Sequence, residues 1–483
     1  MNKPTIVFRA DGSSSMGLGH LFRSAALADM LQEDFQRILL TRCNQEPVLR
    51  NLASCFDRIE VQPEGSAQDD ALQLAALASG EAMAVLDGYH FDTAYQQLLA
   101  DRQVSFACID DIHAYGFLAA TVINHSGGFT PLDYEAEPST TFYLGPAYAL
   151  LRAPFLEAAK TRRQTITDNN CIICFGGADP RNTTLEVLQG EALKNAGFDH
   201  IHVVVGAAYP FREALEAFAG DRADITLHNS LSPDAMATLM QRCSYAICSP
   251  STVVYEYLSV GGVAFLATTA DNQTDVYRYF VGEGLAFPLE KLGQLSDDAI
   301  SDSLAAGARI FDGGSAARYR KLFRQHFDVR SLQVRRANEG DVKTCFDWSN
   351  DPEVRQQSYN QAPIPFEDHT RWFAQKLQDP ACYFYIFERD GEPVAQIRFQ
   401  VAGSEAVLGY LAAPSIRSRG LGAALLASGI EALIRDHSGP LRIIGFVKNS
   451  NIASQRSFEK LAFVKEDTDQ YPDSIKYTLN YGI

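Results

Sequence analysis

The sequence lacks an excess of positive charge. It carries 42 Lys and Arg against 59 Asp and Glu, a net charge of −17 over 483 residues. A broad nucleic-acid footprint needs Lys and Arg clustered on a positive face, so this balance argues against a nucleic-acid partner. It does not exclude a phosphate pocket, because a few Arg side chains and a helix N-terminus are enough to bind one phosphate group.

Long apolar runs are also missing. The opening MNKPTIVFRADGSS turns polar after one short apolar run and has no apolar core of a signal peptide. The uncharged stretch 257–270 contains glycine and is too short to span a bilayer. We therefore expect a cytoplasmic protein without a membrane partner.

The cysteines form no disulfide-like framework. Nine Cys are scattered along the chain, and an odd number in a large chain fits reduced thiols. Cys171 and Cys174 form a C-x-x-C within CIICFGG, a sequence typical of a buried strand. Positions three apart in a strand point to opposite faces, so we expect two core residues rather than a redox or zinc pair.

The hydrophobic pattern predicts three domains, because 483 residues exceed what one core supports. Strands alternate with helices over 1–160 and again over 161–330, which indicates two doubly wound, Rossmann-like α/β domains with parallel sheets. Over 331–483, hairpin strands are mixed with helices, which indicates an α+β domain. The join near 326–333 is polar, so fragments on either side should fold separately.

A glycine-containing turn, RADGSSSMGLGH (9–20), joins the first predicted strand to the first helix. Gly17 and Gly19 permit close backbone approach, and His20 falls at the helix N-terminus in the cleft between the two α/β domains. The helix field there disfavours an imidazolium, so a neutral His20 is suited to accept a proton. A purely structural histidine is the alternative for this segment taken alone.

Two segments of the second domain are suited to bind a nucleoside diphosphate. Gly176 and Gly177 in CFGGADP free backbone N–H groups beside a helix start, although a plain glycine turn is the alternative. In SPSTVVYE (249–256), hydroxyls can donate to phosphate oxygens, and Glu256 can accept both ribose hydroxyls. The polar DNQ (271–273) follows the next strand at the same sheet edge.

Together these segments resemble the UDP-2,4-diacetamido-2,4,6-trideoxy-β-L-altropyranose hydrolases of pseudaminic acid synthesis, which have the two-domain GT-B fold. RADGSSSMGLGH, VLDGYHFD, CIDD, YLGPAYALLRAPF, CFGGADP and SPSTVVYEYL carry the resemblance, in family order over roughly residues 5–330. It implies water attack at the anomeric carbon with inversion and release of UDP, with His20 as the catalytic residue. The substrate contacts expected from the resemblance and the turns are Arg9, Asp11, Gly17, Gly19, Asp87, Tyr89, Asp111, Gly176, Gly177, Asp179, Ser249, Ser251, Thr252, Glu256, Asn272 and Gln273.

A glycosyltransferase that uses a UDP-sugar is the main alternative, because both classes of enzyme bind the diphosphate with the same kinds of groups. The N-terminal pattern favours hydrolysis, as does the lack of an obvious basic and apolar patch for a lipid acceptor. A non-catalytic nucleotide-binding scaffold is a second alternative, against which the intact glycine motifs and His20 argue. His90 and His113 also follow apolar strands and are the nearest rivals of His20.

RSRGLGA (417–423) follows a strand, opens a helix and matches the R/Q-x-x-G-x-G/A signature of the GCN5-related N-acetyltransferases, called GNAT. Glycines there expose N–H groups that cradle the coenzyme A pyrophosphate. NSNIASQRSFEKLAF (449–463) and 335–355 extend the resemblance over about 331–480. It implies acetyl-CoA as co-substrate, with no metal required. The expected contacts are Tyr410, Leu411, Arg417, Arg419, Gly420, Leu421, Gly422, Ala423, Asn451, Ser454 and Phe458.

The third domain departs from its family at Phe458, where many members have a tyrosine that protonates the leaving thiolate. A phenyl ring donates no proton, so Ser454, Ser457 or solvent would take that role. His369 and Glu405 are weak candidates for the base, and backbone N–H groups near Tyr410 could hold the oxyanion.

In the pseudaminic pathway, acetylation of the 4-amino sugar nucleotide comes just before UDP removal. The resemblance therefore implies consecutive steps on one chain, with UDP-4-amino-4,6-dideoxy-N-acetyl-β-L-altrosamine as acetyl acceptor. A legionaminic-type or other bacterial amino sugar nucleotide is an open alternative, since these residues do not specify sugar stereochemistry. They do not specify an oligomeric state either.

Overall fold

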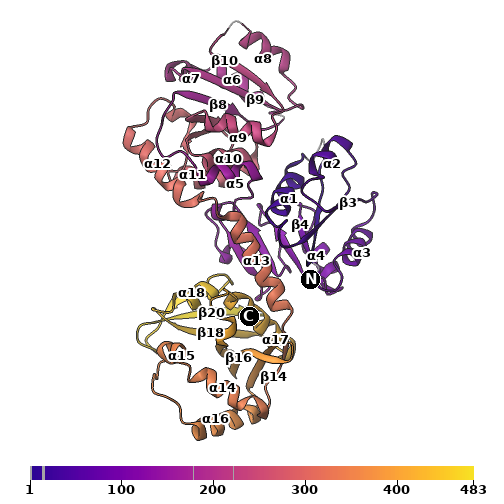
Figure 1. Cartoon of the computed structure of the whole chain (residues 1–483), viewed down its shortest axis with the longest axis vertical. Helices are drawn as coiled ribbons and strands as arrows, with labels where there is room; N and C mark the ends of the chain where they lie inside the picture. The colour runs from indigo at the N-terminus through magenta and orange to yellow at the C-terminus, as the bar shows by residue number, and fades with distance from the viewer. Residues whose placement is uncertain (1–2, 14–16, 178, 221, 483) are drawn as a thin grey trace.

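The computed structural model describes residues 3–13, 17–177, 179–220 and 222–482. It contains three β-sheets, each with its own helices, and we call these the first, second and third units (Figure 1). The first and second units lie against each other, and the third unit lies at the far end of an elongated molecule. Among the described residues, no helix is both long and apolar enough to cross a membrane.

The first unit is a seven-stranded sheet in the order β3-β2-β1-β4-β5-β6-β7, and every pairing is parallel. Its central strands are mostly apolar, apart from charged residues near their carboxyl ends, because helices cover both faces. Its strands are β1 (Thr5–Ala10), β2 (Gln36–Thr41), β3 (Arg58–Val61), β4 (Met83–Asp87), β5 (Phe106–Ile109), β6 (Thr121–Asn124) and β7 (Thr141–Leu144). Its helices are α1 (Gly19–Met30), α2 (Glu46–Leu52), α3 (Ala67–Leu77), α4 (Thr93–Ala100), η1 (Pro131–Asp133) and η2 (Pro146–Tyr148).

The second unit repeats this plan with a six-stranded parallel sheet in the order β10-β9-β8-β11-β12-β13. Its strands are β8 (Asn170–Cys174), β9 (His200–Val205), β10 (Ile225–Asn229), β11 (Tyr245–Cys248), β12 (Val263–Leu266) and β13 (Phe287–Pro288). Its helices are α5 (Ala153–Lys160), α6 (Thr183–Gln189), α7 (Glu191–Ala196), α8 (Arg212–Ala219), α9 (Pro233–Gln241), α10 (Thr252–Val260), η3 (Asp271–Gln273), α11 (Thr274–Gly282), η4 (Leu289–Lys291) and α12 (Asp297–Ile310).

Two features of the second unit bear on the sequence predictions. Cys171 and Cys174 of β8 are both buried and belong to different hydrophobic clusters, which confirms the expectation of two core residues on opposite faces. Helix α5 packs against α9 and α10, although the predicted boundary assigned residues 153–160 to the first domain. The chain therefore crosses into the second unit before α5.

The third unit is a mixed sheet in the order β14-β15-β16-β17-β18-β20-β19, as expected for an α+β domain. Strands β17 and β18 pair in parallel only from Glu405 to Val407 and then separate, which opens a wedge towards Tyr410. Its strands are β14 (Gln333–Arg336), β15 (Cys382–Arg389), β16 (Glu392–Ala402), β17 (Glu405–Ala412), β18 (Leu441–Lys448), β19 (Val464–Asp467) and β20 (Ser474–Tyr481). Its helices are η5 (Glu339–Asp341), α14 (Val342–Ser349), α15 (Pro352–Gln357), α16 (Phe366–Gln378), η6 (Pro414–Ile416), α17 (Gly422–Asp436) and α18 (Ile452–Phe458).

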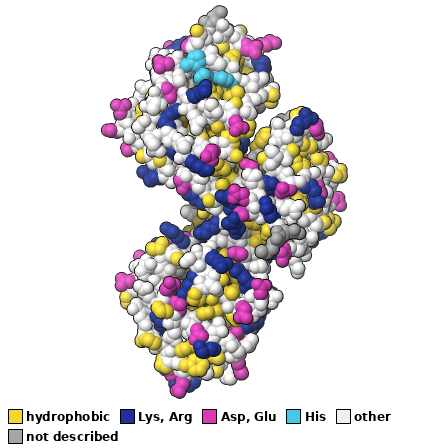
Figure 2. All heavy atoms as spheres, in the orientation of Figure 1, with side chains coloured by type: hydrophobic (Ala, Val, Ile, Leu, Met, Phe, Trp, Pro, Cys, Tyr) yellow, Lys and Arg dark blue, Asp and Glu magenta, His cyan; other side chains and the backbone are white. Residues whose placement is uncertain are grey.

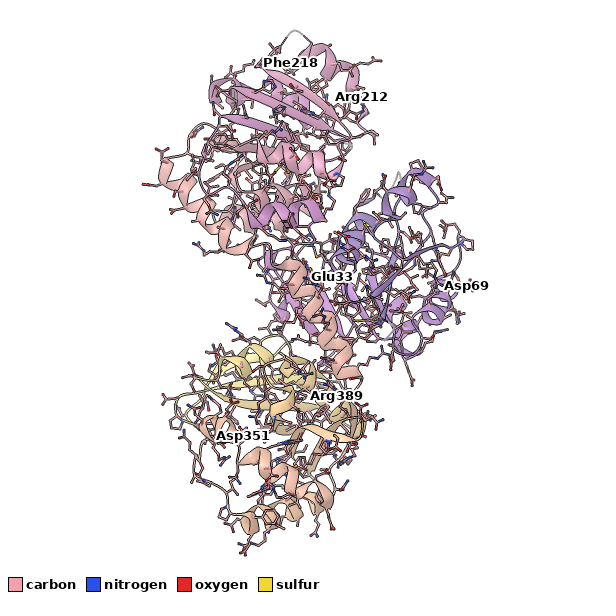
Figure 3. All side chains as sticks on the ribbon, viewed as in Figure 1. Glu33, Asp69, Arg212, Phe218, Asp351 and Arg389 are labelled. Atoms are coloured by element: carbon pink, nitrogen blue, oxygen red, sulfur yellow. The ribbon has the colours of Figure 1, made fainter. Side chains whose placement is uncertain are left out.

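Helix α13 (Ser315–Arg330) joins the three units and runs between them in Figure 1. Its Phe323 belongs to the hydrophobic cluster shared by the first two units, whereas Val329 and the following Leu332 belong to the core of the third unit. Figure 3 shows Glu33 and Arg389 on either side of the helix: Glu33 pairs with Arg320, and Arg389 lies 3.9 Å from Asp328. The predicted polar join is thus a packed helix and a tight turn.

We expect fragments 1–330 and 331–483 each to fold, because each unit has its own sheet and core. The fragment 331–483 loses the packing of Val329, a contribution of roughly 1–2 kcal/mol. It should therefore melt about 2–8 °C below the same unit in the full chain, which calorimetry on both proteins would measure. An insoluble fragment 331–483 beside a soluble full chain would contradict the predicted boundary.

Candidate functional site

A histidine–aspartate pair lies where the first unit faces the second. His20 is the second residue of α1, and Asp87 ends the neighbouring strand β4. His20 Nδ1 lies 2.8 Å from Asp87 Oδ1, and both side chains are almost completely buried. Because an ionised Asp87 can only accept, this contact places the imidazole hydrogen on Nδ1 and leaves Nε2 as a proton acceptor.

Arg23, one helical turn after His20, holds Asp87 in its ionised form. Its guanidinium lies 2.6 Å from Asp87 Oδ1 and 2.7 Å from Asp111 Oδ2. Burial opposes ionisation of Asp87, but the charge of Arg23 and the contact with His20 outweigh it and lower the pKa of this carboxyl group. Tyr89 packs edge-on against His20, with ring centroids 4.7 Å apart, and its hydroxyl donates to Asp111 over 3.4 Å. His20, Asp87, Tyr89 and Asp111 therefore form one cluster, but the predicted substrate contact of Asp87 is wrong, because its side chain has no exposed surface and holds His20 and Arg23.

Arg9 and Asp11 do not join this cluster as substrate contacts. The Arg9 side chain is fully buried and pairs with Asp11 at 2.7 Å and Asp70 at 2.6 Å. The prediction that Arg9 contacts a substrate is wrong, because the guanidinium has no accessible surface and holds the strand ends together. Asp11 also accepts from the backbone N–H of Arg42 at 2.7 Å, and His90 approaches it at 3.5 Å.

The rival histidines occupy other surroundings. His90 is paired with Asp11, and the ring of His113 packs against Phe129 with centroids 4.6 Å apart. Of the predicted turn, Gly17 has a φ of +86° and Gly19 starts α1, whereas 14–16 lie outside the described residues. Of the three histidines, His20 is the one whose ring nitrogen contacts Asp87.

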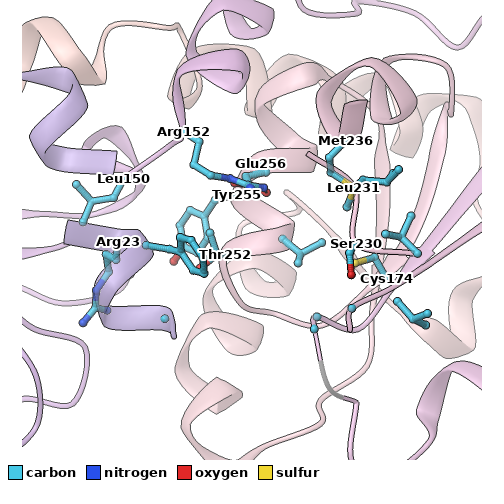
Figure 4. A pocket seen from close by; sticks show the side chains of 18 of the residues that line it. Arg23, Leu150, Arg152, Cys174, Ser230, Leu231, Met236, Thr252, Tyr255 and Glu256 are labelled. Carbon is cyan, nitrogen blue, oxygen red and sulfur yellow. The ribbon is translucent and has the colours of Figure 1, made fainter. Parts of the chain in front are cut away.

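A cavity of about 340 Å³ lies between the first and second units (Figure 4). Arg23 and Leu150 border it on one side, and Ser230, Leu231 and Met236 on the other. Five predicted contact residues line it: Gly19, Gly176, Gly177, Thr252 and Glu256. A cavity between two parallel sheets, at their carboxyl edges, is where doubly wound proteins bind ligands.

The glycine turn after β8 presents bare backbone to this cavity. Gly176 has a φ of +91°, and a Cβ at Gly177 would meet nothing within 4 Å. A Cβ at Gly206 would lie 2.4 Å from the Gly177 carbonyl oxygen, so the turns after β8 and β9 are in close contact. Thr252 begins α10 at the same cavity, so free N–H groups of a helix N-terminus also face it.

Other residues predicted as contacts in the second unit stabilise loops and do not line the cavity. Asp179 is 2% exposed and accepts from the backbone N–H groups of Thr183 and Thr184, so the predicted substrate contact is wrong and the residue caps α6. Ser249 is buried with its hydroxyl 2.9 Å from that of Ser251. The Gln273 side chain accepts from the backbone N–H of Thr269, and the side chain of Asn272 lies outside the description.

Arg23, His125 and Arg152 are among the cavity residues that were not predicted from the sequence. Arg152 donates from Nε and Nη2 to the two oxygens of Glu256, at 2.6 and 2.8 Å, and Arg23 lines the opposite wall. His125 follows β6 and packs edge-on against Tyr255; burial, and then the charge of Arg23, lowers its pKa to about 4. The position of His125 directly after the apolar run TVIN is the one sequence signal that could have revealed it.

In the third unit, the 417–423 loop leads from η6 into α17. Gly420 has a φ of +74°, and a Cβ at Gly422 would lie 2.3 Å from Ser457 Oγ, so α17 and α18 meet closely there. The Tyr410 hydroxyl reaches across the wedge between β17 and β18 to within 3.1 Å of Ser454 Oγ. Leu411 continues β17, and Leu421 and Ala423 flank the start of α17 with buried side chains. A polar cluster therefore stands beside the predicted coenzyme loop.

Several predicted residues of the third unit have structural partners. Arg417 lies 2.7 Å from Asp351 and 3.3 Å from Glu353, so carboxylates of the chain already compensate its charge, and its contact with coenzyme A stays a prediction. The Asn451 side chain accepts from the backbone N–H of Ser454 and caps α18. Phe458 is buried against Gly445, where a Cβ would lie 2.5 Å from its ring.

The two weak candidates for the base lie away from this loop. His369 is 3% exposed among the aromatic rings of α16 and its neighbours, and burial lowers its pKa. Glu405 starts β17, at the opposite end of the strand from Tyr410. Neither position supports a role beside the 417–423 loop.

A family model matches most of the third unit, and known proteins match larger parts of the chain. Residues 331–464 match the family model of the acetyltransferase (GNAT) domain, so the third unit has a GNAT-like fold. An uncharacterized protein of Methanocaldococcus jannaschii is 22% identical over 385 residues, which covers 77% of this chain and 78% of that protein. The spore coat polysaccharide biosynthesis protein SpsG of Bacillus subtilis is 23% identical and covers 60% of this chain and 84% of its own length.

A UDP-2,4-diacetamido-2,4,6-trideoxy-β-L-altropyranose hydrolase of Campylobacter jejuni is 24% identical over 263 residues, covering 52% of this chain and 87% of that protein. Among solved structures, spermidine N-acetyltransferase from Vibrio cholerae in complex with CoA and spermine shares 14% identity, with a TM-score of 0.28. It covers 31% of this chain and 96% of its own. The chain is thus a homologue of the hydrolase and of SpsG, with a GNAT domain at its C-terminal end.

The pairing of Arg152 with Glu256 predicts a pH-dependent stability. Burial raises the pKa of Glu256, and Arg152 opposes this rise. In Arg152→Leu the carboxylate is buried without its partner, which should cost about 3–5 kcal/mol of unfolding free energy at pH 7. Because the pKa of Glu256 is higher in the folded than in the unfolded state, the variant keeps its stability at low pH and loses it as the pH rises through the folded-state pKa.

Urea denaturation of Arg152→Leu should therefore show a smaller loss at pH 5 than at pH 7. The double variant Arg152→Leu/Glu256→Gln is the matched control, because it has no carboxylate to titrate and should lose this pH dependence. An equal loss for Arg152→Leu at both pH values would show that Glu256 is not the titrating group.

Proposed function

We propose that this chain is a bifunctional enzyme of bacterial amino-sugar nucleotide metabolism. The first two units, in a GT-B arrangement, hydrolyse a UDP-diacetamido-trideoxysugar at C1 with inversion and release UDP. The third unit transfers acetyl from acetyl-CoA to the 4-amine of the preceding UDP-amino-deoxysugar. The observation that carries the hydrolase part is the 2.8 Å contact between His20 Nδ1 and Asp87, next to Gly19 and Arg23, which line the inter-unit cavity.

The hydrolytic step needs a proton acceptor for water and stabilisation of the departing diphosphate. Water attacks C1, the C1–O bond breaks, UDP leaves with the bonding electrons, and the proton of water passes to His20 Nε2. Asp87 then stabilises the imidazolium that forms, because its carboxylate already contacts Nδ1. UDP is a good leaving group, so a general acid is less necessary than in ordinary glycosidases.

The second unit supplies the groups suited to hold the diphosphate. The bare backbone of Gly176 and Gly177 and the N-terminus of α10 at Thr252 border the same cavity, and both favour a negatively charged ligand. The similarity to the Campylobacter jejuni hydrolase, which covers 87% of that protein, supports this reading of the first two units. The substrate class comes from that relative and from the residues shared with its family.

Acetyl transfer is supported by the family match over 331–464 and by the 417–423 loop. The sugar amine attacks the thioester carbonyl carbon, the C–S bond breaks, and the coenzyme A thiolate takes a proton. Tyr410 can donate that proton in place of the tyrosine that is absent at position 458, because its hydroxyl stands beside Ser454 and Gly422. Burial raises the pKa of Tyr410, so the phenol remains protonated at neutral pH.

His20→Asn should lower UDP release from the acetylated sugar nucleotide by about 10²- to 10⁴-fold, because water loses its proton acceptor. UDP affinity should stay within a few-fold of wild type, since its proposed contacts come from the second unit. Acetyl transfer should be unchanged. Enzymatic detection of UDP, calorimetry with UDP and thiol release from acetyl-CoA measure the three quantities.

His90→Asn is the matched control, because His90 also borders the first-unit strand ends but contacts Asp11 rather than Asp87. Near-normal UDP release by His20→Asn would remove the proposed base. Faster UDP release by the wild type with added sugar acceptors, together with a new glycoside, would make these units a glycosyltransferase instead.

Tyr410→Phe should slow acetyl transfer by about 10²-fold or more, since it removes the hydroxyl proposed to protonate the thiolate. Thiol release in the presence of the amino sugar nucleotide measures the rate. Tyr383→Phe is the control, because Tyr383 bonds His437 on another part of the third unit. An unchanged rate for Tyr410→Phe would assign the proton to a serine hydroxyl or to solvent.

A further inference from the structure

Helix α13 is fixed in position relative to the first unit. His326 Nε2 lies 2.9 Å from Ser105 Oγ, and the Arg330 guanidinium donates to the carbonyl oxygens of Ala82 and Gly80 at 2.7 and 3.0 Å. Phe323 packs into the shared core of the first two units. Because polar and apolar contacts both hold it, side chains on its other face have defined positions in the full chain.

That other face of α13 contacts the predicted coenzyme A loop. Gln325 Nε2 donates to the carbonyl oxygen of Arg419 over 2.6 Å. A Cβ placed on Gly420 would lie 3.0 Å from Lys321 Cε and 3.3 Å from Lys321 Nζ. The ammonium group of Lys321, which lies outside the matched acetyltransferase segment, therefore stands directly beside the loop glycine.

The positive charge at this place has no counter-ion among the residues that the structure describes. Arg417 is neutralised by Asp351 and Glu353, but no carboxylate of the described residues lies within 4 Å of Lys321, Arg419 or Lys460. Burial, and then repulsion from Lys321, lowers the pKa of Lys460. Figure 2 shows Lys and Arg side chains gathered where the third unit meets the rest of the molecule. The repulsion between neighbouring cations without counter-ions decreases when an anion binds between them.

The third unit is also docked to the first unit at this junction. The backbone N–H of Phe142 in β7 donates to the carbonyl oxygen of Lys460 over 2.8 Å, and Lys460 Nζ lies 4.6 Å from the centre of the Tyr143 ring. The loop, α13 and the edge of the first sheet therefore form one contiguous surface.

We propose that Lys321 binds the diphosphate of coenzyme A, so that the acetyl-CoA site is completed by a helix outside the acetyltransferase domain. The inference rests on the proposed acetyltransferase function. Lys321 adds a charge beside the loop, whereas Arg417 is already paired with carboxylates. A domain cut free of α13 would keep the loop and lose this cation.

The test is calorimetric binding of coenzyme A to the full chain carrying Lys321→Met. Methionine keeps an unbranched stem and removes the charge. We expect about tenfold weaker binding, the loss of one charge-assisted contact. The same loss is expected with 3′-dephospho-coenzyme A, because the diphosphate is unchanged in it. Raising the salt concentration should reduce the difference in coenzyme A affinity between the variant and the wild type, because salt screens the charge of Lys321.

Arg324→Met is the matched control, because it removes a charge one turn along α13 that pairs with Asp34 of the first unit. It should bind coenzyme A as wild type does, and Lys321→Arg should retain most of the affinity. An unchanged UDP affinity in every variant shows that the fold is intact.

Wild-type affinity in Lys321→Met would overturn the assignment while leaving the acetyltransferase proposal in place. A loss that disappears with 3′-dephospho-coenzyme A would also overturn it, since the 3′-phosphate would then be the group bound. If the wild-type chain binds neither ligand, the acetyltransferase proposal falls together with this inference.

Discussion

The buried ion pair between Arg23 and Asp87 is the constraint on which the proposed hydrolase site depends. Asp87 has no exposed side-chain surface, and a carboxylate there is tolerable only because Arg23 and His20 both contact it. The same pair fixes the imidazole of His20, since Nδ1 must donate to a charged oxygen. Arg23 also binds Asp111, which in turn contacts Tyr89. One guanidinium thus holds Asp87 and Asp111 directly, and His20 and Tyr89 through these two carboxylates.

The cavity has Arg23 of this charged cluster on one side and uncharged backbone of the second unit on the other. The first unit contributes side chains with defined protonation, whereas the second unit contributes bare backbone at Gly176 and Gly177 and the start of α10. Backbone N–H groups and helix ends carry partial charges that do not titrate, so this wall is suited to an anion over a wide pH range. Glu256 and Arg152 neutralise each other at the edge of this wall.

Helix α13 gives the fused chain a geometry that separate proteins would lack. It packs on α1, which carries His20, and its Lys321 and Gln325 touch the loop that leads into α17. Helix α13 therefore contacts both α1, whose Gly19 and Arg23 line the inter-unit cavity, and the 417–423 loop of the third unit. If the two proposed reactions follow each other, the product of the third unit is the substrate of the first two. The structure brings their supporting elements together, whereas the cavity itself lies between the first and second units.

The sequence by itself determined the class of each sheet and the turns that carry the glycines. Apolar runs such as VVV in β9 and the glycine motifs are local signals, and local spacing is enough to interpret them. The order in which the strands pair, with β4 beside β1 and β11 beside β8, is decided by tertiary contacts. The chain crossing before α5 and the packed join at α13 likewise needed the tertiary contacts.

Only the tertiary structure decided which polar residues are available to a ligand. Arg9, Asp179 and Arg417 all lie within the predicted motifs. In the folded chain, however, Arg9 pairs with Asp70, Asp179 caps the start of α6, and Arg417 pairs with Asp351. Asp70 and Asp351 are far from their partners in the sequence, so no local pattern predicts these pairs. Arg23, His125 and Lys321 belong to no motif and became candidates through neighbours contributed by distant segments. The physical reason is that hydrogen bonding and charge pairing are satisfied across space, whereas a motif records only order along the chain.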